Sequence, residues 1–78
     1  MEKHNLQQRI AINSEVMMGQ AIIKGTRLTV GFILGLLAQG VTIEEILEEY
    51  NGLTKEDIMA CFLYASKALE QSSVLPLV

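Results

Sequence analysis

Two segments in the second half of the chain carry matching helix-start signals, and they constrain the fold more than any other feature. In each segment a threonine is followed three residues later by an acidic residue: Thr42 with Glu45, and Thr54 with Asp57. At this spacing the two residues form a capping box, in which each side chain binds the other residue's backbone N–H. The two boxes therefore predict helices over residues 43–50 and 55–71.

A further helix is expected over residues 30–39, directly before these two. Thr29 stands at its N-cap position, and Gly40 stands where a left-handed residue would end it. Its side chains are apolar around the axis, so we expect this helix to be central and covered on nearly every side. Gly31 and Gly35 share one face, which predicts that another backbone approaches closely there.

The residues before this helix predict an extended arm. The β-branched runs 9–12 and 21–23 favour two short strands within an arm over residues 9–29. No linker, repeat or low-complexity stretch interrupts the sequence, so a single domain is expected over residues 1–78. The expected fold is mainly α: a three-helix, helix-turn-helix-like bundle with a short N-terminal β-hairpin or extended arm.

Short length and high apolar content predict self-association. The chain has 78 residues, of which 50% are hydrophobic and 19% are charged. This composition argues against disorder, and a domain of this size buries little core by itself. We therefore expect a homodimer. The longest apolar run, residues 30–38, is far shorter than the roughly 20 residues of a membrane span, so we expect a cytoplasmic protein without a membrane partner.

The last expected helix carries two apolar strips, and each needs a surface to cover it. One strip is expected to pack on the other helices and consists of Ile58, Cys61, Phe62, Ala65 and Leu69. The other is assigned to a subunit interface and consists of Met59, Leu63 and Tyr64, with packing against the N-terminal strands as the alternative. Pro76 prevents the apolar tail, residues 72–78, from continuing the helix, so the tail, with Leu75 as its interface residue, folds back or inserts into a partner.

The chain has few residues of the types that catalyse reactions or bind metal ions. The chain has one cysteine, Cys61, and one histidine, His4. A disulfide within the chain and a zinc-type cluster are therefore excluded, and no serine has a catalytic triad's partners. The glutamates of the second predicted helix are interpreted as a solvated face, and the alternatives are paired acids or a divalent-cation site. We expect no enzyme activity, no metal and no cofactor.

Charge divides the chain into a basic and an acidic part. Before Val41, four cations face two carboxylates, whereas from Val41 onward two cations face seven carboxylates. A polyanion would therefore meet the first part. At the start of the last predicted helix, where a helix-turn-helix protein reads DNA, Glu56 and Asp57 accompany the single cation Lys55, and phosphates would repel this pair of anions.

The densest mixture of charge and apolar residues lies between residues 22 and 30. A glycine here can turn the chain, with cations on both sides, so the segment is a candidate anion grip. The alternative is a plain turn whose cations are solvated. If nucleic acid is bound, the expected contacts are Lys24, Gly25, Thr26, Arg27 and Arg9.

Three segments of the sequence resemble the family known as domain of unknown function 433. Residues 19–30, GQAIIKGTRLTV, resemble the family's GKPVIRGTRIPV signature. Residues 37–47 and 53–58, followed by Tyr64-Ala65, resemble its LA-G-S-EEIL and LT-EDI-A-L-YA segments. The sequence departs from the family pattern at Asn13-Ser14, at Gln20-Ala21, where a lysine is lost, and at Asn51-Gly52.

The resemblance implies both a fold and a function. Family members resemble helix-turn-helix proteins, and many look like VapB-type antitoxins that neutralise a small PIN-like ribonuclease toxin and repress their own operon. Gly25, Thr26 and Arg27 would then belong to the functional segment. The leading hypothesis is a dimeric antitoxin or DNA-binding regulator. The alternatives are a protein-interaction module that does not bind DNA, and a binder of small anions at the same loop.

Overall fold

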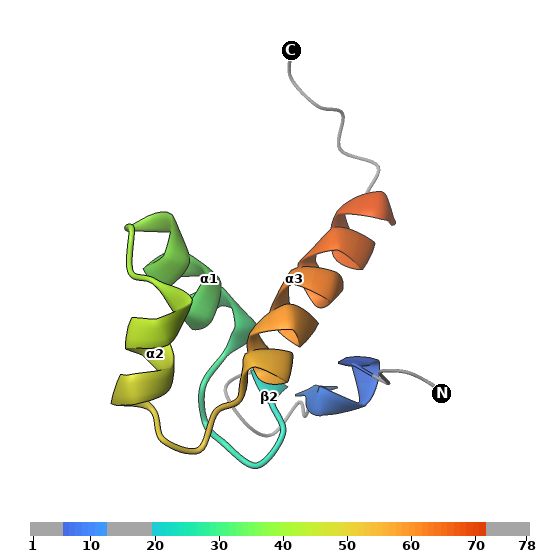
Figure 1. Cartoon of the computed structure of the whole chain (residues 1–78). Coiled ribbons are helices and arrows are strands. Elements are labelled where there is room, and N and C mark those ends of the chain that lie inside the picture. The colour runs from blue at the N-terminus through green and yellow to red at the C-terminus, as the bar shows by residue number, and fades with distance from the viewer. Residues whose placement is uncertain (1–5, 13–19, 72–78) are drawn as a thin grey trace.

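A computed structural model describes residues 6–12 and 20–71 of the chain (Figure 1). In order, its elements are a 3-10 helix η1 (Leu6–Arg9), strands β1 (Ile10–Ile12) and β2 (Ala21–Ile23), and helices α1 (Val30–Ala38), α2 (Ile43–Glu49) and α3 (Lys55–Glu70). The mainly α fold with a short N-terminal hairpin is confirmed. Each helix ends one residue earlier than predicted, and η1 was not predicted. The tail, residues 72–78, lies outside the described residues.

The three helix starts form as their sequences predict. The backbone N–H of Thr42 donates to the Glu45 carboxylate over 2.9 Å, and the Glu45 N–H donates back to the Thr42 hydroxyl over 3.1 Å. The same reciprocal pair joins Thr54 and Asp57, over 2.9 and 3.3 Å. Thr29 accepts from the N–H of the third residue after it, over 2.9 Å. Each cap satisfies a backbone donor that has no partner within its helix.

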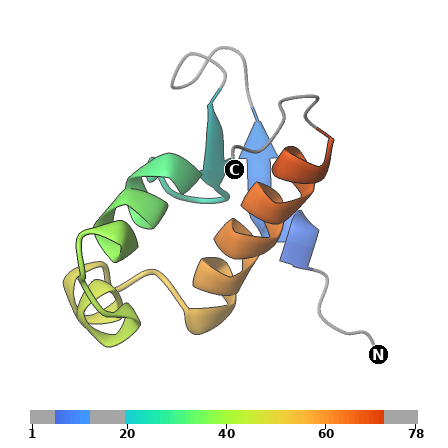
Figure 2. The same ribbon diagram turned by 90° about the horizontal axis from the view of Figure 1, so that it is seen from above.

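A small antiparallel sheet and three helices enclose one apolar core. Strands β1 and β2 pair with Ile10 opposite Ile23. The largest fully buried side chains come from β2 and from all three helices: Ile23, Ile33, Ile46, Ile58 and Cys61. Helix α3 contacts α1, α2, β1 and η1, and Figure 2 shows it lying beside β1. The central element is therefore α3, and the prediction that α1 would be central is wrong.

Helix α1 is less covered than its sequence predicted. Only Val30 and Ile33 are buried in it, and Phe32 is 43% exposed. The Phe32 ring meets Tyr50 edge to face, with ring centroids 6.0 Å apart. A Cβ atom placed on Gly31 or Gly35 would meet nothing within 4 Å, so the predicted close approach of another backbone does not occur among residues 6–12 and 20–71. The described part of the chain therefore covers α1 only partly.

The predicted inner strip of α3 is buried only in its N-terminal half. Ile58 and Cys61 are fully buried, whereas Phe62 is 43% and Leu69 is 75% exposed. The prediction for Phe62 and Leu69 is therefore wrong. Helix α3 has 16 residues and α1 has 9. At about 1.5 Å per residue, α3 extends beyond the length that its neighbour can cover.

No helix among residues 6–12 and 20–71 is long and apolar enough to cross a membrane.

Candidate nucleic-acid interface

The turn between β2 and α1, residues 24–27, is held in place by Thr26 and is called the basic loop below. The Thr26 hydroxyl donates to the Ile23 carbonyl over 2.8 Å and accepts from the Leu28 N–H over 2.9 Å. The Thr26 N–H also donates to the Ile23 carbonyl, over 3.0 Å, and the Ile23 N–H donates to the Leu28 carbonyl over 2.9 Å. These bonds fix the loop as a tight connection. Lys24 and Arg27 are both exposed on it.

Gly25 supplies the backbone conformation that the loop needs. Its φ of 81° lies in the left-handed region, where a side chain with a Cβ is strained. We expect Gly25→Ala to lower the free energy of unfolding by roughly 1 kcal/mol in urea titrations. Gly31→Ala is the matched control. A Cβ there meets nothing within 4 Å and alanine favours helix, so this variant should be neutral or more stable. Equal effects of the two substitutions would contradict the assigned role of Gly25.

Arg9 connects the basic loop to the start of α3. Its carbonyl accepts from the Lys24 N–H over 2.8 Å, and its guanidinium Nη1 donates to Asp57 Oδ1 over 3.1 Å. The Arg9 side chain is 41% exposed and the Asp57 side chain 10% exposed. Arg9 was predicted as a nucleic-acid contact. In the structure, the backbone of Arg9 lies next to the loop, and its side chain pairs with Asp57.

This ion pair changes the charge that α3 presents. Asp57 is buried and paired, so the first turn of α3 exposes one cation, Lys55, and one anion, Glu56. Two anions in this turn were expected to repel phosphate. Because the exposed charges of the turn nearly cancel, this repulsion is small. Helix α2 stays acidic, because Glu44, Glu45, Glu48 and Glu49 are all exposed.

No pattern within the sequence indicated the Arg9–Asp57 pair, because its members are 48 positions apart. The capping box accounted for Asp57 by itself, and Arg9 had no local partner to suggest a structural role. The one usable signal was the position of the polar Asp57 between the apolar residues Leu53 and Ile58, both of which are buried.

The predicted interface residues of α3 differ in their surroundings. Met59, Leu63 and Tyr64 are all partly buried. Met59 lines a shallow hollow with Leu6 of η1, and both Met59 and Tyr64 pack against the buried core. Tyr64 lines a groove with Ile10 and Ile12 of strand β1. The assignment of Met59, Leu63 and Tyr64 to a subunit interface stays a prediction, with packing against the N-terminal strands as its alternative. Leu75, the fourth predicted interface residue, lies outside the described residues.

Cys61 is a buried thiol close to Asp57. Burial first, and the Asp57 carboxylate second, raise the pKa of the Cys61 thiol from 9.0 to about 11. The thiol is therefore protonated at neutral pH and has no access to solvent, since the residue is 0% exposed. Among residues 6–12 and 20–71 there is no group of three or more side chains that could hold a metal ion.

The Cys61 thiol predicts a loss of stability in alkali. Between pH 9 and pH 11 the unfolded chain has released this proton and the folded chain still holds it, following the raised pKa. The free energy of unfolding should therefore be unaffected by this group below pH 9 and should fall as the pH rises through this window. Urea titrations across the window should show this slope, and Cys61→Ala should remove it. An identical slope in the variant would contradict the assignment.

The fold and the loop define a small three-helix protein with a basic turn between its hairpin and its first helix. Residues 10–65 match the family described as protein of unknown function, DUF433, and the chain belongs to that family. It is also similar to the crystal structure of a DUF433 member protein from Anabaena variabilis ATCC 29413, with 39% identity and a TM-score of 0.77. The match covers 85% of this chain and 65% of that chain. No curated protein matches the sequence.

Proposed function

We propose that this protein is a DNA-binding regulator of the antitoxin type, in which the basic loop contacts phosphate. The observation that carries the proposal is the exposure of Lys24 and Arg27 on a loop that Thr26 holds rigid. No described residue forms an ion pair with either cation. Cations held on a preorganised turn lose little side-chain and backbone freedom when they bind a phosphate backbone.

The roles of the loop residues follow from their chemistry. Arg27 can donate two parallel hydrogen bonds to one phosphate, and Lys24 supplies a second positive charge. Gly25 and Thr26 shape the turn that separates them. Phosphate contacts of this kind position a protein on DNA without reading its sequence, so base recognition falls to other groups. A homodimer would present two such loops and double the number of phosphate contacts.

The antitoxin part of the proposal rests on the family resemblance and on an acidic surface, whose charge is opposite to that of the basic loop. Four exposed glutamates on α2 form an acidic face that favours a basic partner over DNA. Exposed apolar side chains such as Phe32 and Phe62 supply surface for protein contacts. In this account the chain masks a PIN-like ribonuclease toxin and represses its own operon. No catalytic step is assigned to the chain itself.

A gel-shift titration with the DNA upstream of the gene, at low salt, tests the DNA-binding part. We expect the wild-type chain to bind and the variant Lys24→Ala/Arg27→Ala to lose roughly tenfold or more in affinity. Lys67→Ala, which removes an exposed cation from α3, is the matched control and should bind like wild type. Absence of wild-type binding, with and without the co-expressed neighbouring gene product, would overturn DNA binding. Unchanged affinity in the loop variant would overturn the role of the loop.

The second candidate is a protein-interaction module that never binds DNA, and the acidic face of α2 favours it. Co-purification with the product of an adjacent gene supports both candidates, so the gel shift separates them. If a complex forms, replacing Glu44 and Glu48 with lysine should weaken it. A complex that tolerates both substitutions would contradict the use of this face.

A further inference from the structure

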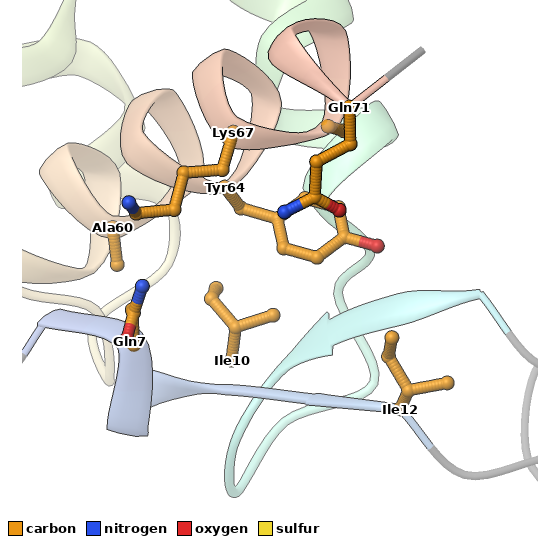
Figure 3. Close-up of a pocket in the computed structure, with 8 residues that line it drawn as sticks. Gln7, Ile10, Ile12, Ala60, Tyr64, Lys67 and Gln71 are labelled. Atoms are coloured by element: carbon orange, nitrogen blue, oxygen red, sulfur yellow. The ribbon is translucent and has the colours of Figure 1, made fainter.

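A groove lies between α3 and the N-terminal elements η1 and β1, and most of its lining is apolar, with Gln7, Lys67 and Gln71 as its polar residues. Its volume is ≈ 410 Å³. Figure 3 shows Ile10 and Ile12 projecting from β1 toward the side of α3 that carries Tyr64. Ala60 and Ala68 complete the apolar lining, and Gln71 lies at the far end. The small alanine side chains leave the space that the groove occupies.

The groove leaves apolar surface open along its outer end. Ile12 is 60% exposed although it lies on the same face of β1 as the half-buried Ile10. Removing apolar side chains from water is favourable, so a segment that fills the groove would gain stability from Ile12 and Tyr64. Along α3 the lining runs from Ala60 to Gln71, roughly 16 Å at the rise of a helix.

We propose that residues 74–78 of the same chain fold back into this groove. The segment follows the groove directly, because Gln71, which lines it, precedes the sequence Ser-Ser-Val-Leu-Pro-Leu-Val. Residues 74–78 span at most about 17 Å when extended, which matches the roughly 16 Å from Gln71 back to Ala60. The tail is therefore long enough to run back along the whole lining.

The composition of the tail suits a segment that reverses direction after α3 and then packs against apolar side chains. Ser72 and Ser73 favour a reversal of the chain, and Pro76 stops the helix and has no backbone N–H to leave unsatisfied. The remaining residues are apolar, like the Ile10, Ile12, Ala60 and Ala68 side chains of the groove. A segment attached next to its site acts at an effective concentration of the order of millimolar, which favours the chain's own tail over a tail from a second copy.

Nuclear Overhauser contacts in the uniformly labelled full chain test the proposal directly. We expect contacts from the Leu75 and Leu77 methyl groups to the Tyr64 ring and the Ile12 methyl groups. An isotope-filtered experiment on a mixture of labelled and unlabelled chains should show none of them. Contacts seen only between a labelled and an unlabelled chain would show that the groove holds the tail of a second copy. Absence of tail contacts in both experiments would also overturn the proposal.

A dye that binds apolar surface provides a second test on folded protein. Leu75→Ser/Leu77→Ser should raise anilinonaphthalene sulfonate fluorescence severalfold, because the emptied groove then binds the dye. Leu69→Ser is the matched control, since Leu69 is 75% exposed and does not line the groove. Far-ultraviolet circular dichroism confirms that each variant is folded. Equal fluorescence of the tail variant and wild type would contradict a groove filled by the tail.

Discussion

Replacing Ile58 with alanine is expected to lower the free energy of unfolding by about 2–5 kcal/mol. Ile58 is 0% exposed and belongs to the buried core together with Ile23 of β2, Ile33 of α1 and Ile46 of α2. Its truncation leaves a cavity in a core to which strand β2 and all three helices contribute. At 0.05–0.15 kcal/mol per residue, a domain of this size has only about 4–12 kcal/mol to lose. Urea unfolding followed by circular dichroism measures the loss.

Leu69→Ala on the same helix is the control for this measurement. Leu69 is 75% exposed, so its truncation should change the free energy of unfolding by less than about 0.5 kcal/mol. The comparison of the two substitutions tests the burial pattern of α3, since each removes an aliphatic side chain of the same size and the difference in helix propensity between leucine and isoleucine is small. Similar losses at the two positions would show that α3 packs with a different face toward the core.

The second large effect is expected at Asp57. Its carboxylate accepts from the Thr54 N–H over 2.9 Å and from Arg9 over 3.1 Å, and the residue is 7% exposed. Asp57→Ala removes the reciprocal half of the capping box and leaves the Arg9 guanidinium without its partner. We expect a loss of roughly 1–3 kcal/mol in the free energy of unfolding, from these two contributions together.

A double-mutant cycle separates the ion pair from the cap. Arg9→Ala alone should cost about 0–1 kcal/mol, because the Arg9 side chain is 41% exposed and solvent screens the pair. The double variant should then cost less than the sum of the single variants, by the coupling energy of the pair. Thr54→Ala, which removes the other half of the box, isolates the cap. Additive losses for Arg9 and Asp57 would show that the pair contributes nothing in solution.

The parts of the fold that the sequence predicted correctly depend on interactions between residues only a few positions apart. Both capping boxes, the threonine cap of α1 and the left-handed glycine at its end act within a few residues of chain. The structure contains all of them, with Gly40 at φ 97°. The strands were predictable for the same reason, because β-branched residues and their flanking turns lie next to each other in sequence.

Packing between distant elements was not predictable from these signals. The apolar sequence of α1 indicated complete burial, but coverage depends on the lengths and crossing of its neighbours, which periodicity does not encode. Phe62 is 43% exposed although it directly follows the fully buried Cys61, so the direction from which the other elements pack on α3 decides which side of the predicted strip is covered. Leu69 lies near the C-terminal end of the helix. The η1 helix likewise depends on its contact with α3, since nothing within Leu6–Arg9 marks a helix.

For the candidate site, the sequence indicated the basic loop but not the role of each residue. The glycine and the flanking cations marked a turn, and the structure shows Gly25 in the left-handed region with Lys24 and Arg27 exposed. Thr26, predicted as a contact to nucleic acid, also holds the turn through its hydroxyl. Arg9 had the charge of a phosphate contact, and only the fold shows its pairing with a residue on α3.

The salt dependence of DNA binding tests the role of the basic loop most directly. The logarithm of the binding constant falls linearly with the logarithm of the salt concentration, with a slope close to the number of phosphates contacted. If Lys24 and Arg27 each contact one phosphate, Lys24→Ala/Arg27→Ala should reduce the slope by about 2 per bound chain, and Lys67→Ala should leave it unchanged. Parallel lines for the wild type and the loop variant would show that phosphate is bound elsewhere or not at all.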